Sequence, residues 1–455
     1  MRAFQCIRNG PNATCKKSDC RVASRAITYR LIRKTLGRSR QSRSRRPGRY
    51  SMITSNFLAL AAIAMAAAFV PSAHAEILIA VAGPMTGQYV STGEEQHQGA
   101  RLAASPSVED PVFDSRLSGI LQKALEEAAR LQKADSISAS LYISDQCYWE
   151  GVSGTTTQDR SAPVESDMLY GFGSITKTFV AAIVLQLVEE NKLSLEDKIE
   201  RWLDKYPNID PNITVHQLLD HTSGLDDYIK NKHFWSDVEA NLDRVWSPEE
   251  ILKYVASPSA PPGDGTRYSN TNYILLGLII EAVTSNPVEK ELEDRIIGPL
   301  NLNSTSLPKS NFEPQRWANS TVPSSSLYSA VWTAGALAST SRDVAKWGHT
   351  LFSGSFLQAT SLERMLVFRD KQIGRSRVPM GMGVWDLSGG EVVAWGHGGR
   401  LDPFLSRMFY LPKLKLSVAY ASSGGHGQGV PGRHLVRAYI ANRPDNISLC
   451  FDSPS

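Results

Sequence analysis

The sequence predicts an α+β fold in which strands from both ends of the chain form one sheet and a helical region is inserted between them. Residues 136–144 alternate apolar and polar side chains as a strand does, and a short turn leads to a hairpin partner at 147–152. Residues 191–354 are mostly helical in pattern, with interruptions at Pro and Gly. Strand character then returns in four segments, at residues 380–387, 391–395, 404–411 and 414–422.

Helices are expected beside this sheet and within the inserted region. Residues 114–133 carry apolar side chains at helical spacing, and a final helix is expected at 433–442. Thr214 and Gln217 form a capping box that opens a short helix, and Thr340 begins a similar pattern ahead of another apolar helical segment. The chain therefore contains enough regular structure for one sizeable folded domain.

The net charge of +4 is the sum of a basic N-terminal part and an acidic remainder, since the first 50 residues alone carry +14. These hold 15 Lys or Arg residues against a single acidic residue, Asp19, and residues 51–75 hold no Lys, Arg, Asp or Glu. The remainder, residues 76–455, is therefore acidic overall. Because the excess of Lys and Arg lies in this leader, nothing in the folded part indicates a nucleic acid or an anionic membrane surface as a partner.

A secretory signal peptide is predicted at residues 52–75. An apolar run at 57–70 leads to an Ala-x-Ala cleavage site before Glu76. The run is shorter than the roughly 20 residues of a transmembrane helix, and no later segment qualifies, so no stable membrane span is expected in the mature chain. We expect an exported protein, periplasmic or secreted. The Arg- and Ser-rich leader, residues 1–51, is expected to be disordered and also fits an organelle transit peptide, which stays an alternative.

Two cysteines, Cys147 and Cys450, lie outside the leader. In an exported protein they either form one disulfide or stay two separate thiols, and both alternatives are open. No cysteine–histidine spacing in the chain resembles a zinc site, so no metal site is expected.

The stretch Gly171-Phe-Gly-Ser-Ile-Thr-Lys177 places a serine and a lysine three residues apart at the start of an apolar helix, expected at about 174–190. Residues at this spacing share one helical face, so the Ser174 hydroxyl and the Lys177 amine can meet. A lysine held in a dry site loses proton affinity and can serve as a base for a serine nucleophile. The simpler interpretation of this short pattern is a serine N-cap beside a solvated lysine, and further motifs are needed to decide.

Two later segments supply candidate partners. Tyr268 and Asn270 lie in Arg267-Tyr-Ser-Asn-Thr-Asn-Tyr273, ahead of an apolar helix, and offer a proton shuttle and an amide that can hold a substrate carbonyl. Alone, this segment also fits a polar turn that caps a helix. Trp395-Gly-His-Gly-Gly-Arg400 contains His397, which can carry a proton near neutral pH, and glycines that allow close approach, Gly399 among them. Alone, it also fits a glycine-rich turn.

Together and in this order, these motifs resemble the superfamily of serine β-lactamases and D-alanyl-D-alanine carboxypeptidases, on the side whose second motif begins with tyrosine. The resemblance spans roughly residues 112–442 and rests on GSITKTF, HQLLDHTSGL, YSNTNYILLG, TAGALASTSRDVAKW and GHGG. It implies a β-lactamase/transpeptidase-like fold: an antiparallel sheet with flanking helices, an all-helical region at roughly 190–354, and an active site between them. A hydrolase domain at 112–445 is expected, with no metal and no organic cofactor.

The resemblance also implies roles. Ser174 attacks a carbonyl, and Lys177 with Tyr268 handles the protons. Asn270 holds the amide on the acyl side, and His397 stands where many relatives place lysine and supplies positive charge or a proton path. The backbone amides of Ser174 and Arg400 form the oxyanion hole. His221 and Asp220 match an architectural stretch and are assigned to structure.

A second resemblance concerns residues 53–103, which are similar to the signal peptide and first strand of periplasmic branched-chain amino-acid-binding proteins. The part after the signal peptide is too short to form a solute-binding fold. Residues 76–111 are therefore interpreted as a short remnant and linker.

Three functions follow. The first is a D-alanyl-D-alanine carboxypeptidase-type or β-lactam-interacting periplasmic enzyme, favoured by the tyrosine-led second motif and the histidine-led third. The second is an esterase or a peptide or amide hydrolase, favoured because Gly398 and Arg400 stand where relatives that act on free carboxylates often carry hydroxyls. The third is a non-catalytic binding protein, against which the intact Ser174, Lys177, Tyr268 and Asn270 argue. The expected partner is thus a peptide, ester or β-lactam small molecule.

Overall fold

The computed structural model describes residues 113–156, 162–310, 316–319, 324–369, 378–389, 392–427 and 429–443. The predicted leader, signal peptide and linker, at 1–51, 52–75 and 76–111, lie outside the described residues. Cys147 is disulfide-bonded, which rules out a separate thiol at this position. Cys450, the partner that the sequence suggests, lies outside the described residues.

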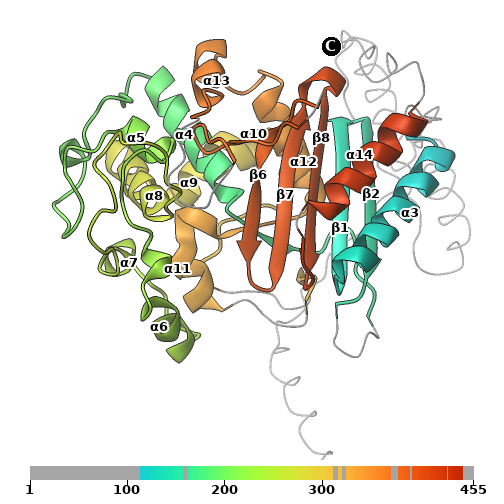
Figure 1. The fold of residues 1–455 in the computed structure, drawn as a ribbon, viewed down its shortest axis with the longest axis horizontal. Coiled ribbons are helices and arrows are strands. Elements are labelled where there is room, and N and C mark those ends of the chain that lie inside the picture. The colour runs from blue at the N-terminus through green and yellow to red at the C-terminus, as the bar shows by residue number, and fades with distance from the viewer. Residues whose placement is uncertain are drawn as a thin grey trace, which may run out of the picture. The chain divides into compact units, whose positions relative to one another are not determined.

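Six strands form one antiparallel sheet, which confirms the predicted α+β fold. Their order is β2-β1-β8-β7-β6-β5, so the N-terminal hairpin pairs with the last strand, with Ser136 opposite Ser423 (Figure 1). The two ends of the described chain therefore meet inside the sheet. The strands are β1 (Ser136–Ser144), β2 (Cys147–Gly154), β5 (Trp385–Asp386), β6 (Trp395–Leu401), β7 (Phe404–Leu411) and β8 (Leu416–Ser423).

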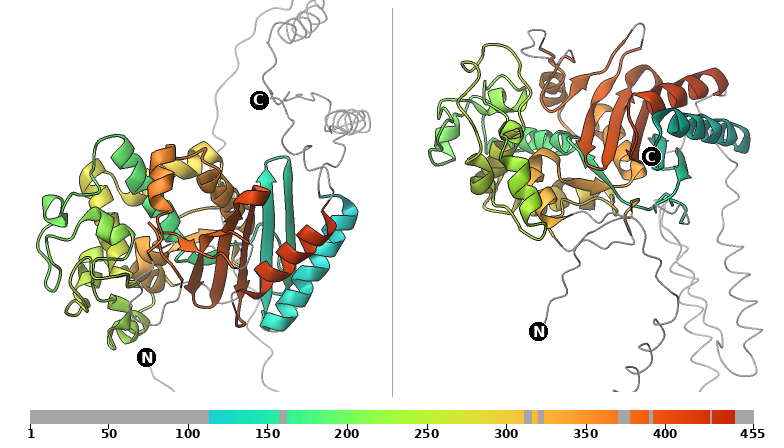
Figure 2. Two further views of the ribbon diagram at one scale, coloured as in Figure 1. Left: turned by 45° about the horizontal axis from the view of Figure 1, so that its top comes forward. Right: turned by 60° about the horizontal axis from the view of Figure 1, so that its bottom comes forward.

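Helices cover both faces of the sheet. On one face, α3 (Ser115–Gln132) and α14 (Val430–Asn442) lie side by side, as Figures 1 and 2 show. Leu117, Leu121 and Leu125 of α3 are buried at helical spacing and pack with the sheet residues of that face. On the other face, α12 (Ser341–Phe352) packs against β1, β7 and β8.

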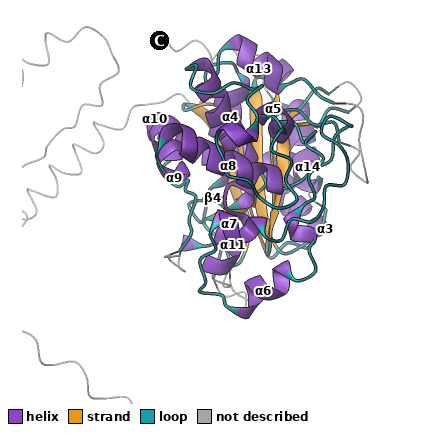
Figure 3. Cartoon of the chain, turned by 90° about the vertical axis from the view of Figure 1, so that its left-hand side faces the viewer, coloured by secondary structure: helices purple, strands orange, loops and turns teal. Residues whose placement is uncertain are grey.

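The inserted helical region lies at the β5 end of the sheet (Figures 1 and 3). Thr214 and Gln217 form the predicted capping box, with both reciprocal hydrogen bonds, and the Thr340 side chain caps α12. The helices are α4 (Thr176–Glu189), α5 (Val215–Leu219), α6 (Phe234–Ala240), α7 (Pro248–Leu252), α8 (Thr271–Thr284), α9 (Val288–Leu292), α10 (Gly298–Leu300), α11 (Ser325–Gly335) and α13 (Ala359–Met365). Shorter turns are the 3-10 helices η1 (Ile199–Arg201), η2 (Tyr228–Lys230) and η5 (Pro412–Leu414), and the π-helix η3 (Glu293–Ile297).

Two predicted strands differ from the structure. The strand expected at 380–387 is reduced to the two residues of β5. Met380 forms isolated bridges with Arg369 and Trp385, and Gly383, with φ +70°, turns the chain between Met380 and β5. The strand expected to end at Trp395 instead begins there and continues to Leu401 as β6. Its glycines look like a turn in sequence, but at Gly396 a Cβ would lie 2.0 Å from the Met408 carbonyl oxygen of β7, so close pairing requires glycine.

A short two-stranded sheet joins the large sheet to the helical region. It pairs β3 (Tyr170–Gly173) with β4 (Leu337–Ser339), and β3 also packs against β6 and β7. The chain passes directly from β3 into α4, which is buried on nearly all sides, as its continuous apolar sequence predicts. Within the described ranges, no helix is long and apolar enough to cross a membrane.

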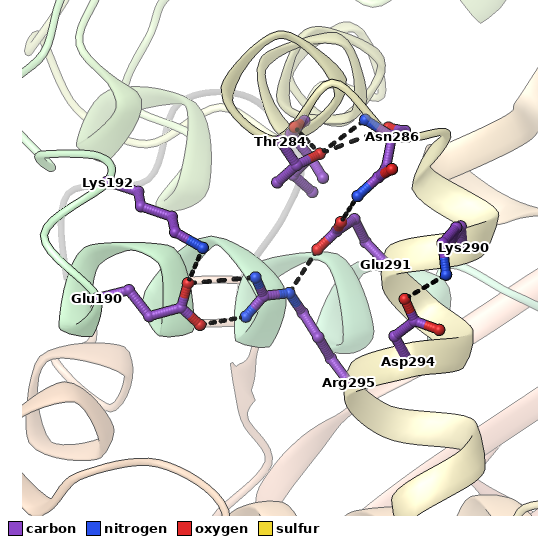
Figure 4. Close-up of polar contacts among 9 residues, drawn as sticks. Glu190, Lys192, Thr284, Asn286, Lys290, Glu291, Asp294 and Arg295 are labelled. Carbon is purple, nitrogen blue, oxygen red and sulfur yellow. Dashed lines mark hydrogen bonds and ion pairs between the residues drawn. The ribbon is translucent and has the colours of Figure 1, made fainter.

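The far end of α4 is fixed by an ionic cluster (Figure 4). Arg295 of η3 contacts the carboxylates of Glu190 and Glu291, and Lys192 contacts Glu190 as well. The Arg295 side chain is largely buried, at 16% exposure, so these contacts are less screened than those of a surface pair. The cluster therefore ties the C-terminal end of α4 to the segment that follows α9.

Candidate active site

The serine lies at the junction between β3 and α4. α4 begins at Thr176, two residues later than predicted, so Ser174 sits just before the helix. The Thr176 hydroxyl donates to the Gly173 carbonyl at 2.6 Å, and the Lys177 N–H donates to the Ser174 carbonyl at 3.1 Å. This tight turn holds the Ser174 side chain at the start of a rigid, buried helix.

Lys177 is fully buried and its Nζ has three oxygen neighbours. Nζ lies 3.1 Å from Ser174 Oγ and 2.8 Å from Asn270 Oδ1, and it also contacts the Ala334 carbonyl oxygen. The two amide oxygens can only accept hydrogen bonds. A neutral amine therefore uses both of its N–H groups on Asn270 and Ala334. Its lone pair is left for the Ser174 hydroxyl, which then donates to Nζ.

Burial lowers the pKa of Lys177 to about 7, and the carboxylate of Asp227 partly opposes this shift. A substantial fraction of the amine is then neutral near pH 7. The geometry and the pKa together suit a base that takes the proton of Ser174. The bland interpretation of the Ser-x-x-Lys pattern, a solvated lysine, is wrong because Lys177 has no exposed surface.

Tyr268 lies beside the same pair. Its hydroxyl is close enough to the Ser174 side chain for the serine to affect its ionisation, and Lys177 Nζ lies 5.1 Å from its ring centroid. Burial raises the pKa of Tyr268, so the phenol keeps its proton at neutral pH. It is thus arranged to donate or relay a proton, while Lys177 is arranged to accept one.

Asn270 connects the lysine to a buried carboxylate. Its Nδ2 lies 3.2 Å from each carboxylate oxygen of Asp227, and its Oδ1 accepts from Lys177. Asn270 also lines the cleft described below, next to Ser174. The predicted contact with a substrate amide therefore stays a prediction, and the structure adds contacts with Lys177 and Asp227.

The third motif brings backbone groups to the serine. A Cβ on Gly399 would lie 1.9 Å from the Phe172 carbonyl oxygen, so β6 and β3 approach each other more closely than any side chain allows. Gly173 has φ +55°, and a Cβ there would lie 2.6 Å from the Arg400 backbone nitrogen. The backbone of Arg400 thus lies against the residue preceding Ser174. An oxyanion hole formed by the backbone amides of Ser174 and Arg400 stays a prediction, and these contacts are compatible with it.

His397 is fully buried on β6. Its Nδ1 lies 2.6 Å from the Gly398 carbonyl oxygen, and burial, then the charge of Lys177, hold its pKa well below the usual value. These surroundings favour a neutral imidazole, so they do not support the expected positive charge at this position. The alternative of a proton path stays a prediction.

The side chain of Arg400 pairs with a carboxylate and does not supply an unpaired positive charge beside Ser174. Arg400 lines the cleft, but its Nε lies 3.0 Å from Asp402 Oδ1 and its side chain is 70% exposed. Its charge is therefore partly answered by a neighbouring carboxylate. Asp220 and His221 are assigned to structure from the sequence. Asp220 contacts Arg369 Nε at 2.9 Å, and the His221 ring lies 4.5 Å from that of Tyr268.

Sequence reasoning missed three participants. Asp227 gave no signal because its role depends on contact with Asn270 across the fold. Ala334 contributes a backbone carbonyl, which no side-chain pattern reveals, and it follows a kink at Trp332, where φ is +28° inside α11. Trp385 of the short strand β5 contacts the His397 ring, with the centroids 4.0 Å apart. The TAGALAST stretch, which supports the family resemblance, was the available pointer to Ala334.

A cleft of about 1500 Å³ opens above these residues. Ser174, Tyr268 and Asn270 lie in its lining, together with residues 398–400. Apolar lining residues come from η2, α6, the loop after α6 and α11; they are Ile229, Trp235, Val238, Leu242, Leu327 and Val331. Among the described residues, no group of three or more His, Cys, Asp or Glu side chains is placed to hold a metal ion.

Solved structures with the same fold include two hydrolases. A D-stereospecific amidohydrolase from Streptomyces sp. is 28% identical with a TM-score of 0.61, and the match covers 70% of this chain and 98% of that one. The D-amino acid amidase from Ochrobactrum anthropi SV3, solved with D-phenylalanine, is 25% identical with a TM-score of 0.63, covering 72% of this chain and 100% of that one.

Curated relatives match over shorter segments. Penicillin-binding protein 4* of Bacillus subtilis (strain 168) is 28% identical over 36% of this chain and 36% of its own length. Esterase EstB of Burkholderia gladioli is 29% identical over 45% of this chain and 53% of its own length. The matches thus span about a third to a half of these relatives. Residues 121–442 match the Beta-lactamase family, which is most of the chain and nearly all of its described part. With Ser174 and Tyr268 in the lining of one cleft and Lys177 buried against Ser174, the chain belongs to the Beta-lactamase family of serine hydrolases.

Proposed function

We propose that this protein hydrolyses the amide or ester bond of a small substrate through an acyl-enzyme on Ser174. The observation that carries the proposal is the environment of Lys177. Its Nζ is held by two oxygens that can only accept, and the third neighbour is the hydroxyl of Ser174. A buried amine with this arrangement is a base with one proton to take.

The reaction then follows in two halves. Ser174 Oγ bonds to the substrate carbonyl carbon while its proton passes to Lys177, and the oxyanion accepts hydrogen bonds from the Ser174 and Arg400 amides. The carbon–nitrogen or carbon–oxygen bond breaks, and the leaving group takes a proton from Tyr268, which Lys177 replaces. Water attacks the acyl-enzyme in the second half, gives its proton to the same groups, and releases the acid and Ser174.

The third motif, residues 395–400, favours a substrate whose leaving group carries no negative charge. The imidazole of His397 is buried and neutral, and the guanidinium of Arg400 contacts Asp402. A free carboxylate bound here gains less from these groups than from an unpaired cation. An amide or ester has no such requirement. The amidohydrolase and the D-amino acid amidase among the solved relatives, and the esterase among the curated ones, support this substrate class.

A D-alanyl-D-alanine carboxypeptidase-type or β-lactam-interacting enzyme is the second candidate. Arg400 lines the cleft on an exposed side chain, so a substrate carboxylate can compete with Asp402 for it. The resemblance to a penicillin-binding protein supports this candidate. Export to the periplasm, the compartment in which such an enzyme acts, remains part of this proposal.

The test is hydrolysis by the wild type and by Ser174→Ala, with Ser353→Ala on the exposed end of α12 as the matched control. The substrates are D- and L-amino acid amides, short esters and a D-alanyl-D-alanine peptide, and intact mass is followed in the presence of a penicillin. We expect Ser174→Ala to lose at least about 10³-fold in kcat/KM, and Ser353→Ala to match the wild type. Undiminished turnover by Ser174→Ala would overturn the nucleophile assignment.

The substrate panel separates the two candidates. Turnover of amides or esters with no lasting penicillin adduct supports the amidase or esterase. Release of D-alanine, or an adduct that maps to Ser174, supports the carboxypeptidase-type or β-lactam-interacting enzyme.

A further inference from the structure

We propose that Asp227 is a positioning residue for this reaction: its carboxylate fixes the Asn270 amide so that the amide oxygen, and not the amide nitrogen, faces Lys177. This inference rests on the proposed function and concerns the same site. It assigns a role to a buried acid that stands outside the serine, lysine and tyrosine of the family motifs.

Asp227 makes three contacts with one residue. Its Oδ1 accepts from the Asn270 backbone N–H at 3.1 Å, and Asn270 Nδ2 lies 3.2 Å from both Oδ1 and Oδ2. The side chain is 3% exposed, so water does not compete for these bonds. Helix α8, which is 14 residues long, begins at Thr271, directly after Asn270. The dipole at its N-terminus favours the negative charge of the Asp227 carboxylate.

The amide of an asparagine can face a neighbour with either its oxygen or its nitrogen, since the two ends have nearly the same shape. A carboxylate has no proton to donate, so only the nitrogen of Asn270 can face Asp227. The oxygen must then face the other neighbour, Lys177 Nζ, at 2.8 Å. The charge at Asp227 thus selects the acceptor that occupies one N–H of the lysine.

The segment that carries Asp227 is itself fixed against the start of α8. The Asp226 carbonyl accepts from the hydroxyls of Ser269 at 3.1 Å and Thr271 at 2.7 Å. The Tyr228 N–H donates to the Thr271 hydroxyl at 3.2 Å. These bonds involve the backbone on both sides of Asp227 and not its side chain. A substitution that keeps the shape of Asp227 therefore changes the carboxylate contacts and leaves this frame in place.

The charge of Asp227 also affects the pKa of Lys177, and a residue with a merely structural role would leave that pKa unchanged. Burial lowers the pKa of Lys177 and the charge of Asp227 raises it again. The other titratable groups near Lys177 are Tyr268, Tyr273, His221 and His397, and burial holds all four in their uncharged forms at neutral pH. On the far side, Lys230 is the additional cation that acts on Asp227, whose own pKa is raised by burial. Loss of the Asp227 charge should therefore lower the pKa of Lys177 further.

The test compares Asp227→Asn with Asp226→Asn in the full-length protein. The two changes remove one negative charge from adjacent positions, but only Asp227 contacts Asn270 through its side chain. For Asp227→Asn we expect kcat to fall roughly 10- to 100-fold, because the amide loses its fixed orientation. We also expect the acid limb of the pH–rate profile to move to lower pH. Asp226→Asn should keep the wild-type kcat and profile.

A double-mutant cycle gives a second, independent measurement. If Asp227 acts through Asn270, then Asp227→Asn should cause little further loss of kcat in an Asn270→Ala background. A full additional loss there, or an unshifted acid limb in Asp227→Asn, overturns the inference. Should Asp227→Asn fail to fold, Asp227→Ser, which keeps a small acceptor without the charge, is measured in the same way. Activity that survives Ser174→Ala would instead refute the proposed function, so the two failures are distinguishable.

Discussion

The indole of Trp385 lies against the imidazole of His397, with the ring centroids 4.0 Å apart and the ring planes tilted by 31°. Trp385 lines the cleft, whereas His397 is fully buried and its Nε2 has no hydrogen-bond partner among the residues that the structure describes. The aromatic cover explains why the imidazole is uncharged: it replaces water that would solvate an imidazolium.

The contact between Trp385 and His397 leads to a prediction for His397. We expect His397→Asn to leave the shape of the pH–rate profile unchanged, because a neutral imidazole contributes no ionisation near neutral pH. The measurement is kcat/KM as a function of pH for both proteins. Disappearance of an ionisation in the variant would show that His397 carries a proton during turnover. Trp385→Phe, which retains an aromatic cover, is the companion variant and should also keep the profile.

The pH dependence of the wild type should report Lys177. A base must be neutral to accept the serine proton, so kcat/KM should be low in acid, rise through about pH 7 and level off above it. The rate rises with pH because the amine must lose its proton to act as a base, and it rises near pH 7 because burial lowers the pKa of this amine. A profile that is flat from about pH 6 to about pH 9 would contradict the assignment of Lys177 as the base. Lys177→Arg should be inactive at every pH in this range, because guanidinium keeps its proton.

Acid should destabilise the fold partly through His221. Its pKa is lowered to about 3 by burial, from 6.5, so the unfolded chain binds a proton that the folded chain does not. The stability contributed by the neutral imidazole is complete above pH 6.5 and is lost as the pH falls from there towards 3. The slope from this one group approaches about 1.4 kcal/mol per pH unit.

Urea unfolding at several pH values measures this slope. His221→Asn should flatten it, and asparagine suits the backbone there because the residue has φ +61°. The exposed His233→Asn is the matched control and should leave the slope as in the wild type. An equally steep slope in His221→Asn would mean that other groups account for the acid sensitivity.

The close approach of β3 and β6 predicts an asymmetry between two glycines. Gly399→Ala places a Cβ 1.9 Å from the Phe172 carbonyl oxygen, so the strands must separate and the Arg400 amide must move from the serine. We expect activity to fall by at least about 100-fold, with a loss of stability. In Gly119→Ala, the new Cβ meets nothing within 4 Å on helix α3 and should stabilise the protein by about 0.5–1 kcal/mol. Kinetics and thermal unfolding of the two variants check this, and an active Gly399→Ala would contradict the geometry.

The sequence predicts this fold well where one segment determines its own structure. The helix caps at Thr214 and Thr340, the apolar helix α4 and the strands β1, β2, β7 and β8 carry local signals, and the Ser174–Lys177 spacing needs only helical geometry to bring the two side chains together. Tyr268 and Asn270 were placed at the site by the family resemblance, since nothing local indicates which distant residues meet a serine.

The remainder depends on tertiary contacts. The glycine-rich strand β6 violates strand propensity because the neighbouring backbones leave no room for a Cβ. The carbonyl of Ala334 becomes a ligand of Lys177 next to a kink at Trp332, and no residue type announces a kink of that kind. The neutral state of His397 follows from burial, which the residue's identity does not reveal.

The pairing of β1 with β8 has a consequence for biosynthesis. Of the strands in the described residues, the first to leave the ribosome hydrogen-bonds to the last, so the central part of the sheet must wait until nearly the whole domain has been made. Such long-range pairing slows folding, because the intervening chain must be closed into a loop before the contact is gained. The segment around Ser174 is synthesised early, but β6, which completes its surroundings, emerges late. A nascent chain therefore carries the serine without its full set of partners, and reactivity should appear only after the last strand has joined the sheet.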